Sequence, residues 1–492
     1  MYQGCIFRKI KKQEENIMRN SKKLAGVLAT AVMVSALAGC GAKTENTGLT
    51  EDGKLLLEFT TTQKEVNEKV YNNSMETYSE FEAYYSEAHP DSKGVSIKPN
   101  YYTYNPKDYA AVALGGQLPT YYSVHLTESK GIMNAGYAKD ITKWMEKHNY
   151  LSGLDEKIKE NIQKDGKIYL LPYDLYSVGI AVNLELLEKA GYVEADGTPH
   201  QPETFDELAQ MAKNIKEKTG MPGFMMPTMA NAGGWRFTPV AWAYGVNFME
   251  QDKDGKWTAT FNTPECVQAL QWVKDLKWKY DVITENALID EKQVRNAFGA
   301  GEAAMAFAEG AQAATFVSAG MNKDNIGFIR MPAGPKRHVT LIGGSYYVFN
   351  NNATDEQIDA VFEFLDWDGK GRVFDDEVKE KMAESIQLKI DEGKAIGILT
   401  SSPYTESDPK RAYEIQLNTV DMANIDINHV KLYNDQSDIE WQHEEPIEAQ
   451  ALYAVLDNII QAVLTDENTD CKALVEEACR DFQATLDVVN NS

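Results

Sequence analysis

The chain has 492 residues, of which 74 are Asp or Glu and 49 are Lys or Arg, so its formal net charge is −25. A surface of this charge repels nucleic acid and anionic lipid headgroups, which argues against a nucleic-acid partner. An anionic ligand would need a local basic pocket, and no cluster of Lys and Arg in the sequence predicts one. A neutral or cationic solute is therefore favoured, and the length suggests two or three domains.

The first 39 residues have the order that is typical of an export signal. Three basic residues between positions 19 and 23 precede an apolar run at residues 24–38, and this run is shorter than the roughly 20 residues of a membrane-spanning helix. It ends in LAGC at residues 37–40, which resembles the bacterial lipobox, in which the cysteine becomes the lipidated N-terminus. We predict a lipoprotein-type signal peptide at residues 1–39 and a lipid anchor at Cys40. The alternative is an ordinary signal peptide with a chance cysteine.

The predicted mature chain is exported and tethered to the membrane. Met18 fits the signal better as a start than Met1 does, and residues 40–53 combine the lipidated cysteine with a polar, Gly-bearing tether. Removal of residues 1–39 takes away seven basic and two acidic side chains and leaves a net charge of −30. The expected location is the extracytoplasmic face of the cell membrane.

Three cysteines remain beyond the lipobox: Cys266, Cys471 and Cys479. Cys471 and Cys479 are eight positions apart in a predicted helix, about 12 Å along its axis, which is too far for a disulfide. All three are expected to be small buried hydrophobic side chains.

Short apolar strands alternate with amphipathic helices along most of the chain. Strands are expected at residues 55–59, 95–97, 121–124, 168–172 and 178–182. Helices are expected at residues 71–88 and after three capping residues, namely Thr204 with Glu207, Thr263 with Pro264, and Thr354 with Gln357. This alternation predicts βαβ units and a mostly parallel sheet, hence an α/β fold. From Thr354 onward the strand pattern is lost, and a mainly helical part is expected.

The sequence lacks the common signatures of catalysis and metal binding. Its seven His residues are scattered without a closely spaced pair, and no phosphate-binding Gly loop ends in Lys-Ser/Thr. Gly343-Gly344-Ser345 lacks the flanks of a nucleophile elbow. We therefore expect no metal, no cofactor and no enzymatic activity.

Eight segments, taken in order, resemble a single protein family. They are FEA at 81–83 followed by His89-Pro90, LGGQLP at 114–119, GYAKDI at 136–141, GKIYLLP at 166–172, NLELLEKAG at 183–191, PETFDEL at 202–208, AFGAGEAAM at 297–305, and Gly343-Gly344. From Lys54 to about Leu486, behind a lipobox, the chain resembles the extracellular solute-binding proteins of bacterial ABC importers. Within them it is similar to family 1, the maltose-binding-like carbohydrate type.

The resemblance implies the type II periplasmic-binding-protein fold, in which two α/β lobes joined by a hinge close over a solute. Residues 54–175 are expected to form the first part of lobe 1, and residues 176–342 the main part of lobe 2. Residues 343–492 are expected to return to lobe 1 and to form a mainly helical C-terminal part that borders the cleft. A monomer of this kind would capture a mono- or oligosaccharide and deliver it to membrane permeases.

The resemblance also implies which residues contact the solute. Sugars are bound by aromatic faces that stack on the ring and by carboxylate or amide groups that take its hydroxyls. Most candidates match contact positions of the family, share a loop with such a position or follow strand ends that border its cleft. Arg236 is included as the neighbour of Trp235, and Trp441 as an aromatic residue of the helical C-terminal part. They are Thr62, Gln63, His125, Glu128, Asp174, Tyr176, Trp235, Arg236, Glu309, Gln312, Ser345 and Trp441.

Three positions depart from the family's pattern. Ala311 replaces the Trp that usually follows Gly310, Thr120 replaces the Asp that usually follows Pro119, and Val124 replaces a usual aromatic residue. The solute could therefore differ from maltose, or be something other than a sugar. Three alternatives stay open: a receptor for a polyamine or other cation, a surface glycosidase with two carboxylates across a groove, and a sensory partner of a membrane kinase.

Overall fold

The computed structural model describes residues 48–105 and 108–491. The predicted signal peptide at residues 1–39, the anchor Cys40 and tether residues 41–47 lie outside the described residues. Residues 48–54 differ from the expected tether because they fold back on the first strand. Leu49 forms an antiparallel bridge with Leu55, and the backbone N–H of Leu56 donates to the carbonyl of Gly48 at 2.8 Å. The folded part therefore begins before Lys54, the predicted start.

A six-stranded sheet forms the centre of the first lobe, which we define by the apolar core around Phe59, Trp144 and Phe362. The strand order is β13-β12-β3-β1-β2, with β6 also paired to β12. Strands β1 and β2 pair in parallel, as the sequence predicts, whereas β12 runs antiparallel to both β3 and β6. The strands are β1 (Leu55–Thr60), β2 (Val95–Asn100), β3 (Tyr121–His125), β6 (Leu170–Ser177), β12 (Val339–Phe349) and β13 (Glu440–His443).

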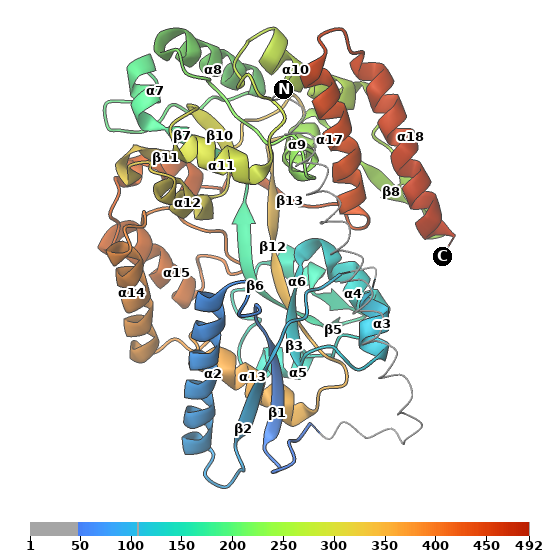
Figure 1. The fold of residues 1–492 in the computed structure, drawn as a ribbon, viewed down its shortest axis with the longest axis vertical. Coiled ribbons are helices and arrows are strands. Elements are labelled where there is room, and N and C mark those ends of the chain that lie inside the picture. Colours follow the sequence, from blue (N-terminus) through green and yellow to red (C-terminus); the bar gives the residue numbers. More distant parts are fainter. Residues whose placement is uncertain (1–47, 106–107, 492) are drawn as a thin grey trace, which may run out of the picture. The chain divides into compact units, whose positions relative to one another are not determined.

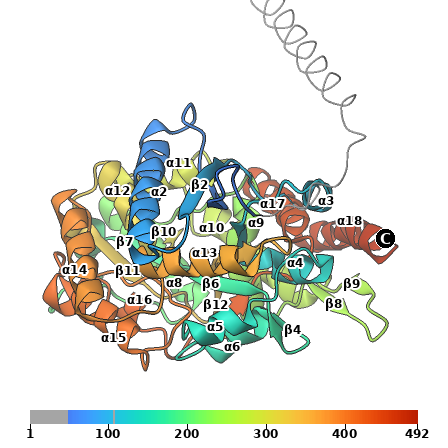
Figure 2. The ribbon, with the colours of Figure 1, turned by 90° about the horizontal axis from the view of Figure 1, so that it is seen from below.

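Helices from distant parts of the sequence pack on this sheet. Phe364 of α13 lies 5.1 Å from Phe81 of α2 and 4.8 Å from Phe59 of β1, measured between ring centroids, so α13 returns to the first lobe (Figure 2). The helices of this lobe are α2 (Glu68–Ala88), α3 (Tyr109–Leu114), α4 (Ser129–Ala135), α5 (Thr142–Lys147), α6 (Glu156–Asn161) and α13 (Asp355–Trp367). Short elements between them are η1 (Leu126–Glu128), β4 (Gln163–Lys164) and β5 (Lys167–Ile168).

The second lobe has a smaller sheet and more helices. We define it by the apolar cores around Phe237, Trp242 and Phe316. In its sheet β7 (Gly179–Asn183) lies between β10 (Met305–Ala308) and β11 (Ile326–Ile329) and runs antiparallel to both. The expectation of a mostly parallel sheet is wrong here, because long helical crossovers can return a strand in either direction.

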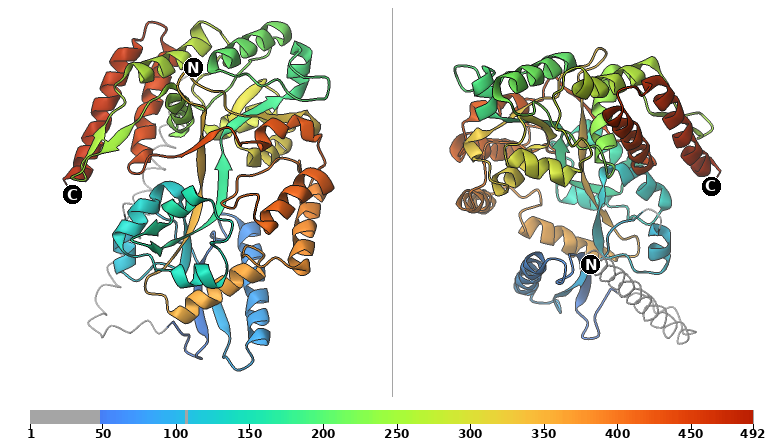
Figure 3. Two further views of the ribbon diagram at one scale, coloured as in Figure 1. Left: turned by 180° about the vertical axis from the view of Figure 1, so that it is seen from behind. Right: turned by 45° about the horizontal axis from the view of Figure 1, so that its top comes forward.

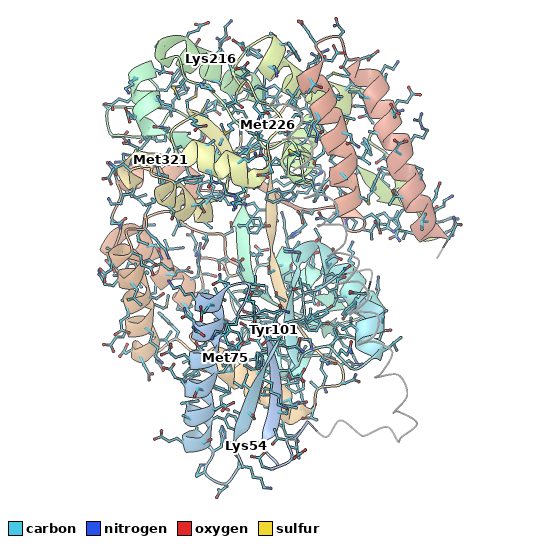
Figure 4. All side chains as sticks on the ribbon, in the orientation of Figure 1. Lys54, Met75, Tyr101, Lys216, Met226 and Met321 are labelled. Atoms are coloured by element: carbon cyan, nitrogen blue, oxygen red, sulfur yellow. The ribbon has the colours of Figure 1, made fainter. Side chains whose placement is uncertain are left out.

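The second lobe's helices surround this sheet. They are α7 (Leu184–Ala190), α8 (Phe205–Thr219), α9 (Ala232–Tyr244), α10 (Pro264–Trp278), α11 (Glu291–Gly299), α12 (Ala313–Ser318), α17 (Ala449–Thr465) and α18 (Cys471–Asn490). The remaining elements are the hairpin β8 (Met249–Gln251) and β9 (Trp257–Ala259), with short turns η2 (Gly310–Gln312) and η3 (Lys323–Asn325). Met226 lies in the core of this lobe, and Met75 packs against the core of the first (Figure 4).

The predicted helix starts are present. Thr204 accepts from the backbone N–H of Glu207, Thr263 accepts from that of Cys266 with Pro264 at the first turn, and Thr354 and Gln357 form a complete capping box. Each cap satisfies backbone donors that a helix leaves free. Cys266, Cys471 and Cys479 are unbonded to one another and buried, as predicted.

The C-terminal part is mainly helical and divides between two places. Helices α14 (Asp376–Asp391) and α15 (Pro409–Gln416), with η4 (Leu417–Asp421), share a small core of Ile386, Ile396 and Leu417. Helix α16 (Lys431–Asn434) and η5 (Ile427–His429) lead on toward β13. Helices α17 and α18 lie side by side and contribute to the core of the second lobe (Figure 3). In this respect the structure differs from the expectation that residues 343–492 return to the first lobe.

No helix within residues 48–105 and 108–491 is both long and apolar enough to cross a membrane.

Candidate functional site

Strand β12 belongs to both lobes, and β6 runs beside it from the first lobe toward the second (Figure 1). Val339 and Leu341 of β12 lie in the core of the second lobe, whereas Ile342, Tyr346 and Val348 lie in that of the first. The two strands pair along their length, from Ile342 opposite Ser177 to Val348 opposite Leu170. Any side chain on the open face of this pair therefore lies where the two lobes are joined.

The β6–β12 pair contains a β-bulge, and this bulge changes the direction of the Tyr173 side chain. The register shifts between Ser345 and Tyr346, so that Tyr173 is the extra residue of β6. The ring of Tyr173 stacks on that of Tyr347, with centroids 3.8 Å apart and planes 8° apart. Tyr173 is exposed and Tyr347 is half-buried, so the stacked pair presents an aromatic surface to solvent.

Gly343 and Gly344 are required by the close approach of β6. A β-carbon on Gly344 would overlap the carbonyl oxygen of Asp174, and one on Gly343 would overlap the ring of Tyr176. Because both glycines lack this carbon, the Tyr176 ring can lie against the backbone of β12. The Gly343-Gly344 pair noted in the sequence is therefore a packing device at the junction of the lobes.

Three candidate residues lie side by side on the open face of the sheet. Ser345 is directly opposite His125 of β3 on one side and Asp174 of β6 on the other. Opposed residues of antiparallel strands point to the same face, and His125 and Asp174 are exposed there while Ser345 is half-buried. The opposite face is closed by the core, which includes Val124 and Tyr346. A hydroxyl, a carboxylate and an imidazole are thus available to one ligand.

A cavity of about 420 Å³ continues this face toward α2. The stacked tyrosines line it together with Thr60, Ser74 and Ser123. Its polar groups include hydroxyls, which both donate and accept hydrogen bonds, together with the Asn73 amide and the charged Asp368 and Lys370, and aromatic rings form part of its walls. This combination suits a polyhydroxylated ring.

Tyr176 and Trp235 meet where β6 reaches the second lobe. Their rings are 6.2 Å apart with planes at 76°, and Trp235 is half-buried. Burial raises the pKa of Glu444 to about 7, against the opposing effect of the Tyr453 hydroxyl and the Trp235 indole beside it. The two aromatic candidates therefore lie next to a carboxyl group on the segment that joins β13 to α17.

Arg236 is the centre of an internal ion cluster rather than the exposed ligand contact that was expected. Its side chain is 0% exposed, and its guanidinium binds Glu291 at 2.6 Å and Glu309 at 2.5 Å. Its carbon Cζ also lies 4.3 Å from the centre of the Trp235 ring. Arg236 thus packs against the ring of Trp235, and its side chain has no solvent-exposed area that a solute could contact.

Glu309 and Gln312 belong to the same cluster. The Gln312 amide donates to Glu291 at 2.9 Å and also to Glu309. Burial opposes ionisation of both carboxyls: the Arg236 charge still lowers the pKa of Glu291, whereas burial leaves the pKa of Glu309 raised. Both predicted contacts are 7% exposed and engage one another, so the structure does not present them as open binding groups.

The remaining candidates lie at the edges of the site. Thr62 is half-buried and Gln63 exposed in the loop between β1 and α2. Glu128 accepts a hydrogen bond from the Tyr104 hydroxyl at 3.1 Å. Trp441 of β13 donates to Gln436 at 3.1 Å and lines a separate cavity of about 290 Å³ with Ser177 and others. None of these four side chains lies on the strand face that holds Ser345.

Sequence reasoning missed Tyr347 as a site residue. Once Ser345 is placed on the open face of a strand, the period of two puts Tyr347 on the same face, so the signal was present. The orientation of the Tyr173 side chain was harder to predict, because the β-bulge interrupts the alternation of side chains along β6.

The arrangement holds polar groups and aromatic faces for binding. In the described part of the chain, no three His, Cys, Asp or Glu side chains are grouped to hold a metal ion.

Comparison with known proteins agrees with this geometry. Residues 72–367 match the family described as bacterial extracellular solute-binding protein. Lipoprotein LipO of Bacillus subtilis (strain 168) is 24% identical over 293 residues, which cover 54% of this chain and 55% of LipO. The match therefore spans about half the length of that relative.

Solved structures with the same fold include maltose-bound MalE3 of T. maritima, with 19% identity and a TM-score of 0.60 over 88% of this chain and 99% of that one. The GacH receptor of Streptomyces glaucescens has 20% identity and a TM-score of 0.58 over 88% and 98%. UgpB of Mycobacterium tuberculosis has 15% identity and a TM-score of 0.60 over 88% and 99%. These likenesses confirm the predicted type II periplasmic-binding-protein fold.

Proposed function

The chain belongs to the bacterial extracellular solute-binding proteins, and on this premise we propose that it captures a carbohydrate between its lobes and delivers it to the permeases of an ABC importer. The solute leaves chemically unchanged, because the protein supplies binding and no catalysis. Transport energy comes from a separate ATPase.

The strand face of β3, β12 and β6 is the observation that carries this proposal. Stacked Tyr173 and Tyr347 offer a flat apolar surface, and beside it lie His125, Ser345 and Asp174, whose side chains form no hydrogen bond with another described residue. Sugars need both, since one side of the ring is lined by C–H groups while its rim carries hydroxyls. Relatives of this fold support the same class: MalE3 is bound to maltose, GacH to acarbose, and a third is named a chitin oligosaccharide binding protein.

We propose that the protein works as a monomer on the extracytoplasmic face of the cell membrane, held by lipid at Cys40. The name of the relative LipO, a lipoprotein, and the LAGC sequence at residues 37–40 support this location. Removal of the cysteine tests the anchor. Without a lipid at position 40, the Cys40→Ala protein should be released into the medium or should keep its signal peptide. Retention of a processed Cys40→Ala protein in the membrane would contradict the anchor.

The direct test is a thermal-shift screen of the purified protein against mono- and oligosaccharides. A bound sugar raises the melting temperature with concentration, and it should be recovered intact. Trp235→Ala should weaken that binding while the protein stays folded, and Trp278→Ala, at an exposed position on α10, serves as the matched control. Cleaved sugar in the tube would replace this proposal with a glycosidase.

A cationic solute is the second candidate. Tyr176 lies within the electrostatic influence of Asp174 and Glu444 and next to Trp235, and a cation binds favourably over such aromatic faces when carboxylates are near. UgpB, of the same fold, is in complex with glycerophosphocholine. Polyamines and choline esters therefore belong in the same screen, and a melting shift with these compounds alone would favour this candidate.

A further inference from the structure

A third cavity, of about 410 Å³, lies between β6 and the helices α14 and α15. Six of its lining residues are basic and three are acidic, although acidic residues greatly outnumber basic ones in the whole chain. The basic residues are Lys370, Arg372, Lys381, Lys389, Lys410 and Arg411. The sequence expectation that the chain has no basic pocket is therefore wrong. These residues come from three segments, after α13, on α14 and on α15, and so form no run in the sequence.

Two of the six charges have no carboxylate partner in the described part of the chain. Four are paired: Arg372 with Asp408, Lys370 with Asp368, Lys381 with Glu377, and Arg411 with Glu414. The two others, which form no such ion pair, are Lys389 and Lys410. Lys389 is exposed on α14.

Lys410 is half-buried, and its ammonium is held by carbonyl groups. It donates to the carbonyls of Gly369 and Gly371 at 2.8 and 2.7 Å. An ammonium has three donors, so one donor remains for a ligand. Burial and the nearby Arg372 charge lower the pKa of Lys410 to about 8, which an anion beside it would reverse.

Buried donors without partners also line this cavity. Among the described residues, the Arg372 Nε and the hydroxyls of Tyr150 and Tyr404 have no hydrogen-bond partner. Tyr150 is 2% exposed and the Arg372 side chain 8% exposed, and the guanidinium of Arg372 stacks on Tyr404 at 3.6 Å. Native proteins rarely leave such donors unpaired. Three residues of this basic cavity thus carry polar groups that are unpaired among the described residues, and an acceptor-rich group beside them would complement them.

This basic cavity adjoins the strand face of the proposed binding site. Tyr173 and Asp174 line it from β6, and Tyr173, Asp368 and Lys370 also line the cavity of about 420 Å³ next to Tyr347. A solute whose ring stacks on the tyrosine pair therefore has its next unit, or a substituent, within reach of the basic cavity.

We propose that the basic cavity binds an anionic group of the solute, a carboxylate or a sulfate, so that the carbohydrate is an acidic oligosaccharide. This inference rests on the proposed function, since it identifies the class of sugar. Charge-assisted hydrogen bonds from Lys389, Lys410 and the unpaired donors provide the recognition.

The test measures affinity for matched pairs of sugars. One arm uses uronic-acid oligosaccharides with their carboxyl-reduced forms, and the other uses sulfated oligosaccharides with their desulfated forms. We expect acidic members of one arm to bind at least about tenfold more tightly than their neutral counterparts, the effect of one hydrogen bond to a charged group. The arm that shows this difference identifies the anion. Equal affinity within both arms, or binding of neutral sugars alone, would overturn the inference while leaving carbohydrate capture intact; no binding in either arm by any sugar would count against the proposed function itself.

Two variants on α14 locate the effect. Lys389→Gln should weaken binding of the acidic sugar about tenfold and leave its neutral form unchanged. Lys379→Gln removes an equal charge from the same helix, where Lys379 pairs with Asp376 outside the cavity, and should change neither affinity. Equal losses in the two variants would show a general charge effect and contradict a site at this cavity.

Discussion

The two sides of the proposed site contain similar polar side chains, but those of the second lobe are buried and paired, whereas those of the first lobe are exposed. On the side of the second lobe, Arg236, Glu309 and Gln312 are buried and bind one another. On the side of the first lobe, His125 and Asp174 are exposed beside Ser345. Residue type alone therefore says little about ligand contact. What separates a structural group from a binding group is whether its hydrogen-bonding capacity is already used within the protein.

Removal of the buried cation should have the largest effect. In Arg236→Met, Glu309 loses its counterion inside the lobe and Glu291 keeps only Arg295 at 3.8 Å, and we expect the free energy of unfolding to fall by about 3–5 kcal/mol. Urea denaturation measures the change. Arg480→Met, which breaks exposed pairs with Glu477 and Asp481, should have little effect. If Arg236→Met were as stable as the parent, the cluster would be open to solvent and the contrast between the two sides would fail.

Glu445 is a buried carboxyl that forms no ion pair with a described residue, so it can be compared with the paired carboxyls around Arg236. Glu445 is 6% exposed and accepts from the Trp242 indole at 3.2 Å, and burial raises its pKa from 4.5 to about 7. Between pH 4.5 and 7 the folded protein therefore binds more protons than the unfolded chain. The contribution of Glu445 to the free energy of unfolding is fully present below pH 4.5 and is lost as the pH rises toward 7. We expect a loss of about 2–3 kcal/mol from this group over that window.

Denaturation curves from pH 4.5 to 8 provide the measurement. Glu445→Gln should remove part of the decline, and Glu444, whose pKa is raised to about 7 in the same way, contributes another part. An unchanged slope in Glu445→Gln would show that this carboxyl is hydrated or already paired, like Glu291.

The glycine pair tests how β6 is held against β12. Gly343→Ala would place a methyl group against the Tyr176 ring, and overpacking of this kind costs about 1–3 kcal/mol. Tyr176→Ala removes the obstacle, so the cost of Gly343→Ala should largely vanish in the double variant, as unfolding measurements can show. Gly131→Ala, where a β-carbon would meet open space in α4, should be neutral. Additive effects of the two changes at 343 and 176 would contradict the close approach.

Local sequence patterns predicted the elements well. The strand near Leu55, the capped helix after Thr204 and the helix opened by Pro264 lie where periodicity and capping placed them. These features depend on residues within a few positions of each other, so a single sequence contains them.

Pairing over long distances could not be predicted in the same way. The antiparallel direction of β7, the packing of α17 on the second lobe and the assembly of the basic cavity all depend on which distant segments meet. Arg236 is the clearest example: its place next to Trp235 suggested a ligand contact, whereas its partners Glu291 and Glu309 lie 55 and 73 positions away. Charge satisfaction is a property of the fold and is absent from the local sequence.

The smallest effect concerns the open side and tests whether its aromatic pair binds sugar. Tyr347→Ala removes one ring of the stack, and we expect the affinity for a bound sugar to fall about three- to tenfold, corresponding to roughly 0.5–1.5 kcal/mol for an aromatic contact. Tyr347→Phe keeps the ring and loses only the hydroxyl, so it should retain most of the affinity if the ring face carries the contact. Titration calorimetry with the sugar found in the screen measures both variants. Equal losses for Ala and Phe would move the contact from the ring to the hydroxyl, and no loss in either would mean that the solute lies against the second lobe, where the half-buried Trp235 offers an aromatic surface.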